Sequence, residues 1–323
     1  MRVLVIKTSS MGDIVHALPA VSDMVAAVPG LEVHWLAESA FAAIPELHAG
    51  VARVIPMSWR KWRARLFAAK TWRAINALRA ELRSQPYDLV LDLQGLVKSA
   101  LWGRQAAGPL AGYDAKSARE PLAAWFYARK ASVAMDLHAI DRCRQLAAAH
   151  LGYRVPATPP DFGLRMPAAG WRPRRDRYAV LIPGASRVEK LWPERRWAAV
   201  GQRLRMKDWL PVVLWGSNEE QTLAERIAAS CEGDVPPFLK VGDVAGLLAG
   251  AEHVVGLDTG FTHLAAALGR PTMGIYCDHE PGLAGITGSG DAVVASIGGK
   301  GQVPSQQDVM ALLEQQLVIA ANR

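Results

Sequence analysis

The sequence has 323 residues, half of them hydrophobic, with a formal net charge of +7 and a pI near 9.5. This length suits two domains of ordinary size, and the composition excludes extensive disorder. The excess of positive charge predicts an anionic partner, of which nucleic acid, a membrane surface and an acidic ligand are the main classes.

Cysteine usage and hydropathy indicate the compartment. Three widely spaced cysteines, Cys143, Cys231 and Cys277, disfavour a disulfide scaffold or a zinc site and fit a reducing compartment. We expect no signal peptide, because the apolar start is short and runs into Lys7. No apolar stretch approaches the roughly 18 residues that span a bilayer. These features together predict a cytoplasmic protein.

The first predicted strand and the helix after it place a carboxylate at a ligand-binding position. Residues 3–6, which follow Arg2, are apolar and largely β-branched, which predicts a buried parallel strand. After a loop of small residues, helical spacing of apolar side chains begins at Ile14. Asp13 therefore follows the carboxyl end of a strand, where open α/β sheets bind ligands. The alternative is that Asp13 only caps the helix.

The rest of the first half alternates between the two patterns. Residues 31–36 and 88–93 are predicted strands, and residues 72–82 and 141–151 are predicted helices. Five prolines between Pro156 and Pro173 then exclude both a helix and a central strand. We place the interdomain linker at about residues 155–176.

The second half repeats the alternation. The predicted strands and helices are, in chain order, 178–182, 197–204, 211–215, 219–229, 253–257 and 261–268. Such alternation predicts a doubly wound parallel sheet. We therefore predict two α/β domains, residues 1–160 and 175–323, with a ligand-binding cleft between them. Packing of the last helix back on the first domain stays open.

The motif D-T-G-F-T-H, residues 258–263, is the sharpest in the second half. It joins a predicted strand to a predicted helix N-terminus, where unpaired N–H groups and the helix dipole favour an anion. Gly260 lets a phosphate approach the backbone closely. The alternative is a capped helix with His263 satisfied in the core.

A second anion-competent loop, residues 184–190, follows the strand 178–182 and ends in Lys190. A lysine on such a loop reaches a phosphate as a point charge. The alternative is a solvated surface lysine. Two such loops in one domain favour a diphosphate ligand over either loop alone.

The segment W-R-K-W-R-A-R, residues 59–65, interleaves arginine and lysine with tryptophan. This pattern is typical of segments that bind nucleic acid, acidic sugars or an anionic membrane surface. The alternative is a solvated helix face. Elsewhere the sequence lacks G-x-G-x-x-G, a P-loop, H-E-x-x-H, G-x-S-x-G and any D-x-D pair that would hold a divalent metal.

Several segments together resemble one known family. They are K-T-S-S-M-G-D-I-V-H-A-L-P-A (7–20), L-D-L-Q-G-L-V-K-S-A (91–100), S-A-R-E-P-L-A (117–123), the lysine loop with W-P-E (192–194) and the motif 258–263. In these residues the sequence resembles the lipopolysaccharide heptosyltransferases of glycosyltransferase family 9. The resemblance covers most of the chain, and the K-T-S-S-M-G-D opening favours heptosyltransferase I over heptosyltransferase II.

The resemblance implies a GT-B fold, in which two Rossmann-like doubly wound parallel-sheet domains face a central cleft. It implies inverting transfer of L-glycero-D-manno-heptose from ADP-L-glycero-β-D-manno-heptose to a Kdo residue of Kdo2-lipid A, in lipopolysaccharide inner-core synthesis. It implies no cofactor and no essential metal. Carried onto this chain, it makes Asp13 the general base. It assigns binding of the sugar donor to Ser186, Lys190, Glu220, Asp258, Thr259, Gly260 and His263.

Contacts with the acceptor follow from charge and position alone. The candidates are Ser10, Gly12, Arg60, Arg63, Lys98 and Arg119. The basic first domain suits the Kdo carboxylate, the lipid A phosphates and peripheral docking on the cytoplasmic face of the inner membrane. The rival interpretations are heptosyltransferase II or another nucleotide-sugar GT-B enzyme and, more distantly, a non-catalytic nucleic-acid-binding protein. We expect no nucleic acid as a partner.

Overall fold

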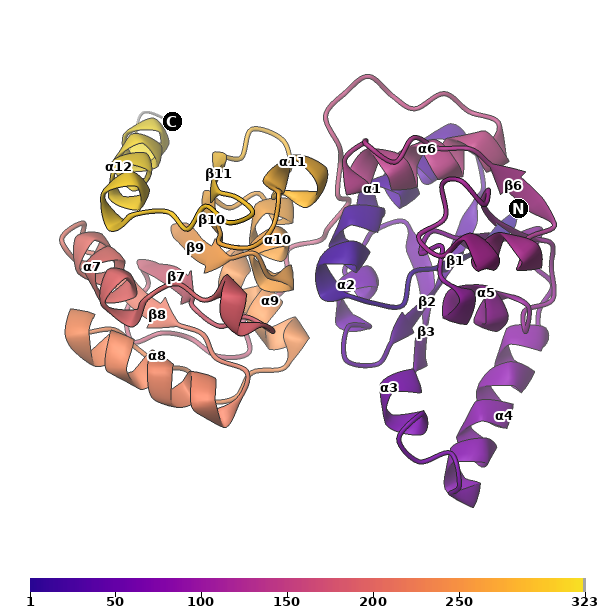
Figure 1. Ribbon diagram of the computed structural model, residues 1–323, viewed down its shortest axis with the longest axis horizontal. Coiled ribbons are helices and arrows are strands. Elements are labelled where there is room, and N and C mark those ends of the chain that lie inside the picture. Colours follow the sequence, from indigo (N-terminus) through magenta and orange to yellow (C-terminus); the bar gives the residue numbers. More distant parts are fainter. Residues whose placement is uncertain (322–323) are drawn as a thin grey trace. The chain divides into compact units, whose positions relative to one another are not determined.

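A computed structural model describes residues 1–321 of the chain. The chain forms two compact units, one of residues Met1–Arg165 and one that begins at Met166 (Figure 1). The division falls in the proline-rich stretch between the two sets of strands. Each unit is built around its own parallel sheet, with helices on both faces.

The first unit contains a six-stranded parallel sheet in the order β3-β2-β1-β4-β5-β6. Its strands are β1 (Arg2–Ile6), β2 (Glu32–Glu38), β3 (Val51–Met57), β4 (Leu89–Asp92), β5 (Leu110–Tyr113) and β6 (Arg129–Ala131). β1 pairs with β2 on one side and with β4 on the other. The order therefore reverses between β1 and β4, and doubly wound sheets bind ligands at such a point.

Helices cover both faces of this sheet. They are α1 (Met11–Ala27), α2 (Ala43–Glu46), α3 (Trp59–Trp62), α4 (Ala69–Arg83), α5 (Val97–Gly103), the 3-10 helix η1 (Pro121–Phe126) and α6 (Ala139–Leu151). Side chains of α4, α5 and η1 pack on strand residues such as Leu4, Ile6 and Val90 in one apolar core. α1 and α6 pack together, and the buried Arg144 guanidinium of α6 binds the Asp23 carboxylate of α1 at 2.7 Å.

The second unit contains a five-stranded parallel sheet in the order β8-β7-β9-β10-β11. Its strands are β7 (Tyr178–Ile182), β8 (Leu210–Val213), β9 (His253–Leu257), β10 (Thr272–Tyr276) and β11 (Val294–Gly298). Here the strand order reverses between β7 and β9, which pair directly. Loops after these two strands are again the expected ligand-binding position.

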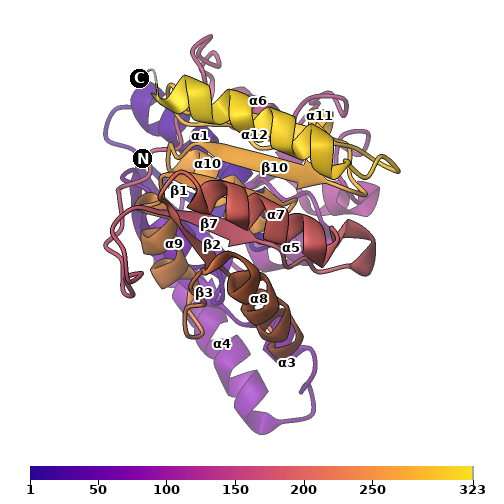
Figure 2. The same cartoon turned by 90° about the vertical axis from the view of Figure 1, so that its left-hand side faces the viewer.

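The helices of the second unit divide between the two faces of its sheet. They are η2 (Val188–Lys190), α7 (Glu194–Arg205), α8 (Asn218–Cys231), α9 (Val241–Ala249), α10 (Gly260–Ala267), α11 (Pro281–Ala284) and α12 (Gln306–Ala321). α7, α8 and α12 share one core with the strands (Figure 2). The packing of α12 was left open by the sequence. Its Val309, Leu313 and Leu317 lie in this second-unit core, and its Glu314 pairs with Arg203 of α7.

The structure confirms the strands and helices that the sequence predicts, with β7 and β9 matching to the residue. It also contains elements that we did not predict. β3 carries Arg53 and Pro56 within its run, and α9 contains two glycines, so neither shows the usual composition of its type. Across residues 1–321, no helix combines the length and apolar character that a membrane span requires.

Candidate active site

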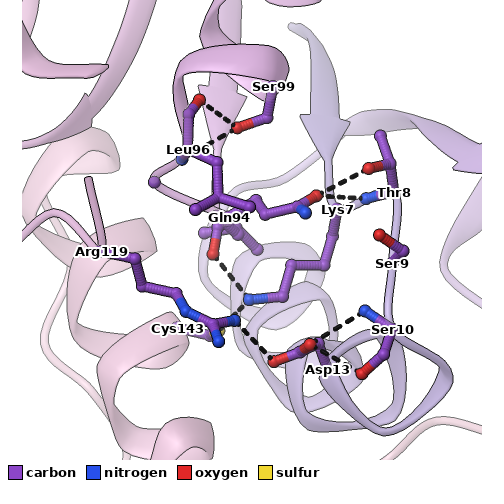
Figure 3. A network of polar contacts seen from close by, with 12 residues as sticks. Lys7, Thr8, Ser9, Ser10, Asp13, Gln94, Leu96, Ser99, Arg119 and Cys143 are labelled. Carbon is purple, nitrogen blue, oxygen red and sulfur yellow. Dashed lines mark hydrogen bonds and ion pairs between the residues drawn. The ribbon is translucent and has the colours of Figure 1, made fainter. Parts of the chain in front are cut away.

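The first turn of α1 holds the carboxylate of Asp13 in a fixed orientation. Ser10 is the N-cap of α1, and Asp13 is the third residue of the helix. Asp13 Oδ2 accepts hydrogen bonds from the Ser10 backbone N–H at 2.9 Å and from the Ser10 hydroxyl at 2.8 Å (Figure 3). This is a capping-box contact, and it occupies one carboxylate oxygen. Asp13 therefore helps to cap α1, as the alternative interpretation holds. The N-cap position itself, however, is occupied by Ser10 and not by Asp13.

The second oxygen of Asp13 lies in a positively charged environment. Asp13 Oδ1 is 3.4 Å from the Arg119 guanidinium, and the Asp13 side chain remains 26% exposed. Burial raises the pKa of Asp13, but the charge of Lys7, the Ser10 hydrogen bonds and the charge of Arg119 outweigh it. The pKa therefore lies below its ordinary value of 3.8. An ionised, partly exposed carboxylate of this kind can accept a proton from a ligand.

Two polar groups just after β4, the Leu93 carbonyl and the Gln94 side chain, support the loop that carries Asp13. The buried Lys7 ammonium donates a hydrogen bond to the Leu93 carbonyl at 2.8 Å. The backbone N–H and the hydroxyl of Thr8 both donate to Gln94 Oε1, each at 2.8 Å. Figure 3 shows the Lys7, Gln94 and Asp13 side chains on the same side of the segment from Thr8 to Ser10. These contacts therefore fix the loop after β1 and the loop after β4 relative to each other.

The Asp92 side chain fixes the loop after β4 through several hydrogen bonds. The sequence analysis did not single this residue out. Its buried carboxylate accepts hydrogen bonds from Gln94 N–H at 2.8 Å, Ser99 Oγ at 2.7 Å and Tyr127 OH at 2.8 Å. Burial raises the pKa of Asp92 despite these contacts. Lys7, Asp92 and Gln94 all lie in segments that carry the family resemblance. Their roles were missed because a buried polar side chain cannot be distinguished from an exposed one by spacing alone.

The predicted acceptor residues fall into two groups. Ser10, Gly12, Lys98 and Arg119 lie around the Asp13 loop: Lys98 Nζ is 3.3 Å from Ser9 Oγ, and Arg119 contacts Asp13 itself. Arg60 and Arg63 lie on α3 and at its end, beyond β3. Among the described residues, no hydrogen bond or ion pair joins the two groups.

Glu38 connects the two groups electrostatically and was missed by the sequence analysis. This buried carboxylate ends β2, where its backbone N–H donates to the Thr8 carbonyl at 3.1 Å. Glu38 Oε1 accepts a hydrogen bond from the Arg60 backbone N–H at 3.1 Å. Burial raises the pKa of Glu38, while that hydrogen bond and the charges of Arg60, Lys98 and Arg63 act in the opposite direction. Glu38 thus holds the start of α3 beside the Asp13 loop.

Lys190, Asp258 and His263 form a compact cluster where the strand order of the second sheet reverses. Lys190 ends η2 after β7, and Asp258 directly follows β9. The Lys190 ammonium lies 2.5 Å from Asp258 Oδ2, and His263 Nε2 lies 3.3 Å from Asp258 Oδ1. Burial raises the pKa of Asp258, but hydrogen bonds from His263 and Lys190 lower it far below its ordinary value. Asp258 therefore holds Lys190 in place as a carboxylate with both oxygens engaged.

The N-terminus of α10 adds backbone donors beside this cluster. Thr259 is the N-cap and Gly260 the first helical residue, one position earlier than the sequence predicts. The N–H groups of Gly260 and Phe261 lie in the first turn, where helices have no internal acceptor for them. Thr262 Oγ1 donates to the Leu257 carbonyl at 2.6 Å, which fastens the helix start to β9. Lys190 and this helix terminus together can bind an anionic group.

Glu220 and Ser186 complete the predicted set in this unit. Glu220 lies in the first turn of α8, and its Oε2 accepts a hydrogen bond from the Gly216 backbone N–H at 2.7 Å. A Cβ atom on Gly184 would overlap the same carboxylate, so Glu220 also lies against the loop after β7. Ser186 is exposed on that loop, four residues before Lys190. Within residues 1–321, no group of three or more His, Cys, Asp or Glu side chains is arranged to hold a metal ion.

Comparison with known proteins decides the family. The model of glycosyltransferase family 9 (heptosyltransferase) matches residues 75–312. The chain belongs to glycosyltransferase family 9. It is therefore an enzyme that transfers a glycosyl group, and the matched range includes the Lys190–Asp258–His263 cluster.

The similarity to individual members extends over nearly the whole chain. Lipopolysaccharide heptosyltransferase 1 of Escherichia coli K12 is 42% identical over 299 residues, which are 91% of this chain and 93% of that protein. The structure of E. coli heptosyltransferase WaaC with ADP matches with a TM-score of 0.88 and 39% identity, covering 98% of this chain and 100% of WaaC. WaaC with ADP-2-deoxy-2-fluoro heptose matches with a TM-score of 0.84 and 38% identity, covering 98% and 99%. This family 9 enzyme therefore has the GT-B type of fold that the family resemblance implies.

Proposed function

We propose that this family 9 glycosyltransferase catalyses the heptosyltransferase I reaction. It transfers L-glycero-D-manno-heptose from ADP-L-glycero-β-D-manno-heptose to a Kdo residue of Kdo2-lipid A, with inversion at the anomeric carbon. The observation that carries the proposal is the 42% identity to a lipopolysaccharide heptosyltransferase 1 over nine-tenths of both chains. The likeness to WaaC structures that hold ADP and a fluorinated ADP-heptose supports the same sugar donor.

The second unit supplies the binding site for the sugar donor. Lys190 and the N–H groups at the start of α10 bind the diphosphate, because negative charge grows there as ADP leaves. Asp258 and His263 act on Lys190 by holding its ammonium, and Thr259 adds a hydroxyl at the helix start. Glu220 binds the nucleotide ribose, and Ser186 adds a contact from the loop after β7.

The first unit supplies the general base. Asp13 accepts the proton of the acceptor hydroxyl as that oxygen attacks the anomeric carbon, and ADP departs from the opposite face. The transition state is oxocarbenium-like, as in other glycosyl transfers. The low pKa of Asp13 keeps it ionised before the acceptor arrives. Lys98 and Arg119 beside it, with Arg60 and Arg63 near Glu38, bind the anionic acceptor.

The acceptor is a lipid, so the enzyme meets it at a membrane. A net charge of +7 and the basic segment from Arg60 to Arg73 suit an anionic surface. We infer that the enzyme works as a peripheral protein on the cytoplasmic face of the inner membrane.

The test is release of ADP from ADP-heptose in the presence of Kdo2-lipid A, with and without EDTA. We expect release that requires the acceptor, that persists in EDTA and that is lost in Asp13→Ala. The matched control is Asp136→Ala, which removes an exposed aspartate from the same unit. Absence of release by folded wild-type protein would rule out the assigned substrates.

A further inference from the structure

The turn between α3 and α4 carries bare apolar side chains at its tip. Phe67 is fully exposed, and Leu66 is 39% exposed. Figures 1 and 2 both show this turn extending well beyond the strands of the first unit. Exposed apolar side chains that are adjacent and project from a fold mark interaction surfaces more often than isolated ones do.

Hydrogen bonds within the turn give this tip a defined shape. The Trp72 indole N–H donates to the Leu66 carbonyl at 2.7 Å, and the Ala68 backbone N–H donates to the Arg65 carbonyl at 3.1 Å. Trp72 itself remains half exposed. The turn is therefore already ordered, and Leu66 and Phe67 are exposed at its tip without a further folding step.

The base of the projection is anchored in the protein core. The Trp59 and Trp62 rings lie 6.1 and 5.8 Å from the buried Trp102 ring of α5, measured between ring centroids. Ile75 and Leu78 of α4 pack in the same core. Because its base packs in the core, the apolar tip has a fixed position relative to the rest of the first unit. A loose hydrophobic loop would not.

Positive charge surrounds the tip. Residues 47–80 contain no aspartate or glutamate. Arg65, Lys70 and Arg73 flank the apolar pair, and within residues 1–321 none of them has an acidic partner within 4.0 Å. Uncompensated cations next to exposed apolar side chains and a half-exposed indole match the layered chemistry of an anionic bilayer surface.

We propose that residues 65–73 form a membrane anchor. Leu66 and Phe67 enter the boundary between headgroups and acyl chains, Trp72 lies at the level of the headgroups, and Arg65, Lys70 and Arg73 bind phospholipid phosphates. The partner is the bulk anionic bilayer and not the acceptor molecule. Arg60 and Arg63, which we assign to the acceptor, lie on the Glu38 side of α3 and are not part of the anchor.

Only the biological role of the anchor rests on the proposed function, because the anchor would hold the Asp13 loop near a membrane-embedded acceptor. Its binding is therefore tested on vesicles that contain no acceptor. We expect wild-type protein to cosediment with phosphatidylethanolamine–phosphatidylglycerol vesicles and not with phosphatidylcholine vesicles. The variant Leu66→Ser/Phe67→Ser is expected to lose about tenfold or more in partitioning, since two large apolar side chains no longer leave water. Arg65→Glu/Lys70→Glu is expected to abolish the preference for anionic lipid.

Met206→Ser is the matched control. Met206 is a highly exposed apolar residue of the second unit, but its neighbour Arg205 lies near Asp208 and Glu232, at 3.7 and 3.6 Å. We expect this variant to bind vesicles like the wild type. Equal loss in Met206→Ser, or wild-type binding by Leu66→Ser/Phe67→Ser, would overturn the anchor.

Fluorescence gives the position of the tip directly. The three native cysteines, Cys143, Cys231 and Cys277, are buried, so an environment-sensitive dye can be placed selectively on Phe67→Cys. We expect a blue shift of the dye on anionic vesicles and quenching by lipids labelled near the headgroup. A dye that stays in water on bound protein would overturn insertion.

Transfer assays separate the anchor from the proposed function. With a deacylated, water-soluble acceptor, Leu66→Ser/Phe67→Ser is expected to match the wild type, and with vesicle-embedded acceptor it is expected to be slower. Equal rates in both assays would contradict a role for the anchor in catalysis at membranes. Failure of all proteins, wild type included, with both acceptors would refute the proposed function, and the vesicle binding would still decide the anchor.

Discussion

Each unit of the molecule has an aspartate in the loop region where its strand order reverses: Asp13 in the first unit and Asp258 in the second. The two carboxylates differ in whether an oxygen remains free to bind a ligand. Asp258 is bound on one oxygen by Lys190 and on the other by His263, and its side chain is only 11% exposed. Asp13 is bound on one oxygen by Ser10, while the other faces Arg119 at 3.4 Å and the side chain is 26% exposed.

The difference shows that position in the fold and chemical role are separate properties. Both aspartates have a lowered pKa, so both are ionised, but the causes differ. Direct hydrogen bonds from two side chains stabilise Asp258 and leave it no free oxygen. Charge at a distance, from Lys7 and Arg119, contributes much of the effect on Asp13 and leaves one oxygen accessible. We therefore assign proton transfer to Asp13 and positioning to Asp258.

The largest expected effect tests Asp13 as the base. Asp13→Asn retains a side-chain oxygen for the Ser10 contact but cannot accept the proton, so kcat should fall by about 10²- to 10⁴-fold. The affinity for ADP should stay nearly unchanged, because the nucleotide site is assigned to the other unit. Steady-state kinetics and calorimetric titration of ADP measure the two quantities. A comparable loss of ADP affinity in the folded variant would contradict the division of roles.

The second prediction tests the Lys190 cluster. Lys190→Met removes the cation assigned to the diphosphate, and a charge-assisted hydrogen bond contributes about 1.5–3 kcal/mol. The affinity for ADP should therefore fall roughly ten- to a hundredfold. Lys207→Met, which changes an exposed lysine of the same unit, is the control and should bind ADP normally. Wild-type affinity in Lys190→Met would mean that this ammonium serves only the ion pair with Asp258.

The third prediction concerns the acid limb of the pH profile. Asp13 acts as a base only when ionised, so its lowered pKa should let activity persist to lower pH than an aspartate of ordinary pKa would allow. Its contribution to stability has the same sign: it is present above the unfolded-state pKa and lost as pH falls through the folded-state pKa. Lys7→Met removes a main cause of the lowering, so the acid limb of kcat/KM should move to higher pH.

Lys98→Met is the matched control for this shift. Its ammonium is also near the loop, 3.3 Å from Ser9 Oγ, but it is not among the main causes of the low pKa of Asp13. The acid limb should stay in place in this variant. An unchanged limb in Lys7→Met, with the fold intact by circular dichroism, would show that Lys7 acts on the loop only through its hydrogen bond to Leu93.

The sequence predicted where the site residues lie along strands, loops and helices, because those positions follow from residue spacing. It did not predict which polar side chains are buried or which residues they contact. Strand, loop and helix patterns located Asp13, Lys190 and Asp258 at the carboxyl ends of strands, and β7 and β9 matched to the residue. The resemblance supplied the candidate roles. Hydrogen bonds between segments far apart in the chain could not be predicted, because strand pairing and not sequence distance decides them.

Glu38 and Gln94 illustrate that limit. Glu38 ends β2 and Gln94 lies two residues after β4, and from composition each of these polar residues would be placed in solvent. Pairing of β1 with β2 and β4 instead buries both beside the Asp13 loop, where Glu38 meets α3 and Gln94 meets Thr8. The short β11 was missed for a related reason, since its five residues form an edge strand beside β10 and lack a fully buried run.

The smallest expected effect tests how tightly the second unit holds Glu220. A Cβ on Gly184 would overlap the Glu220 carboxylate, which is the flexible end of a side chain, so Gly184→Ala should displace that carboxylate without moving the strand. We expect KM for ADP-heptose to rise a few-fold and kcat to change little, because Glu220 is assigned to the ribose and not to the reacting atoms. Gly216→Ala is the control, since its Cβ would lie 3.2 Å from Glu220 Oε2 and should need a smaller shift. A fall in kcat at unchanged KM would place Glu220 nearer the transferred sugar than the ribose, and the second unit would then contribute to the chemical step as well as to binding.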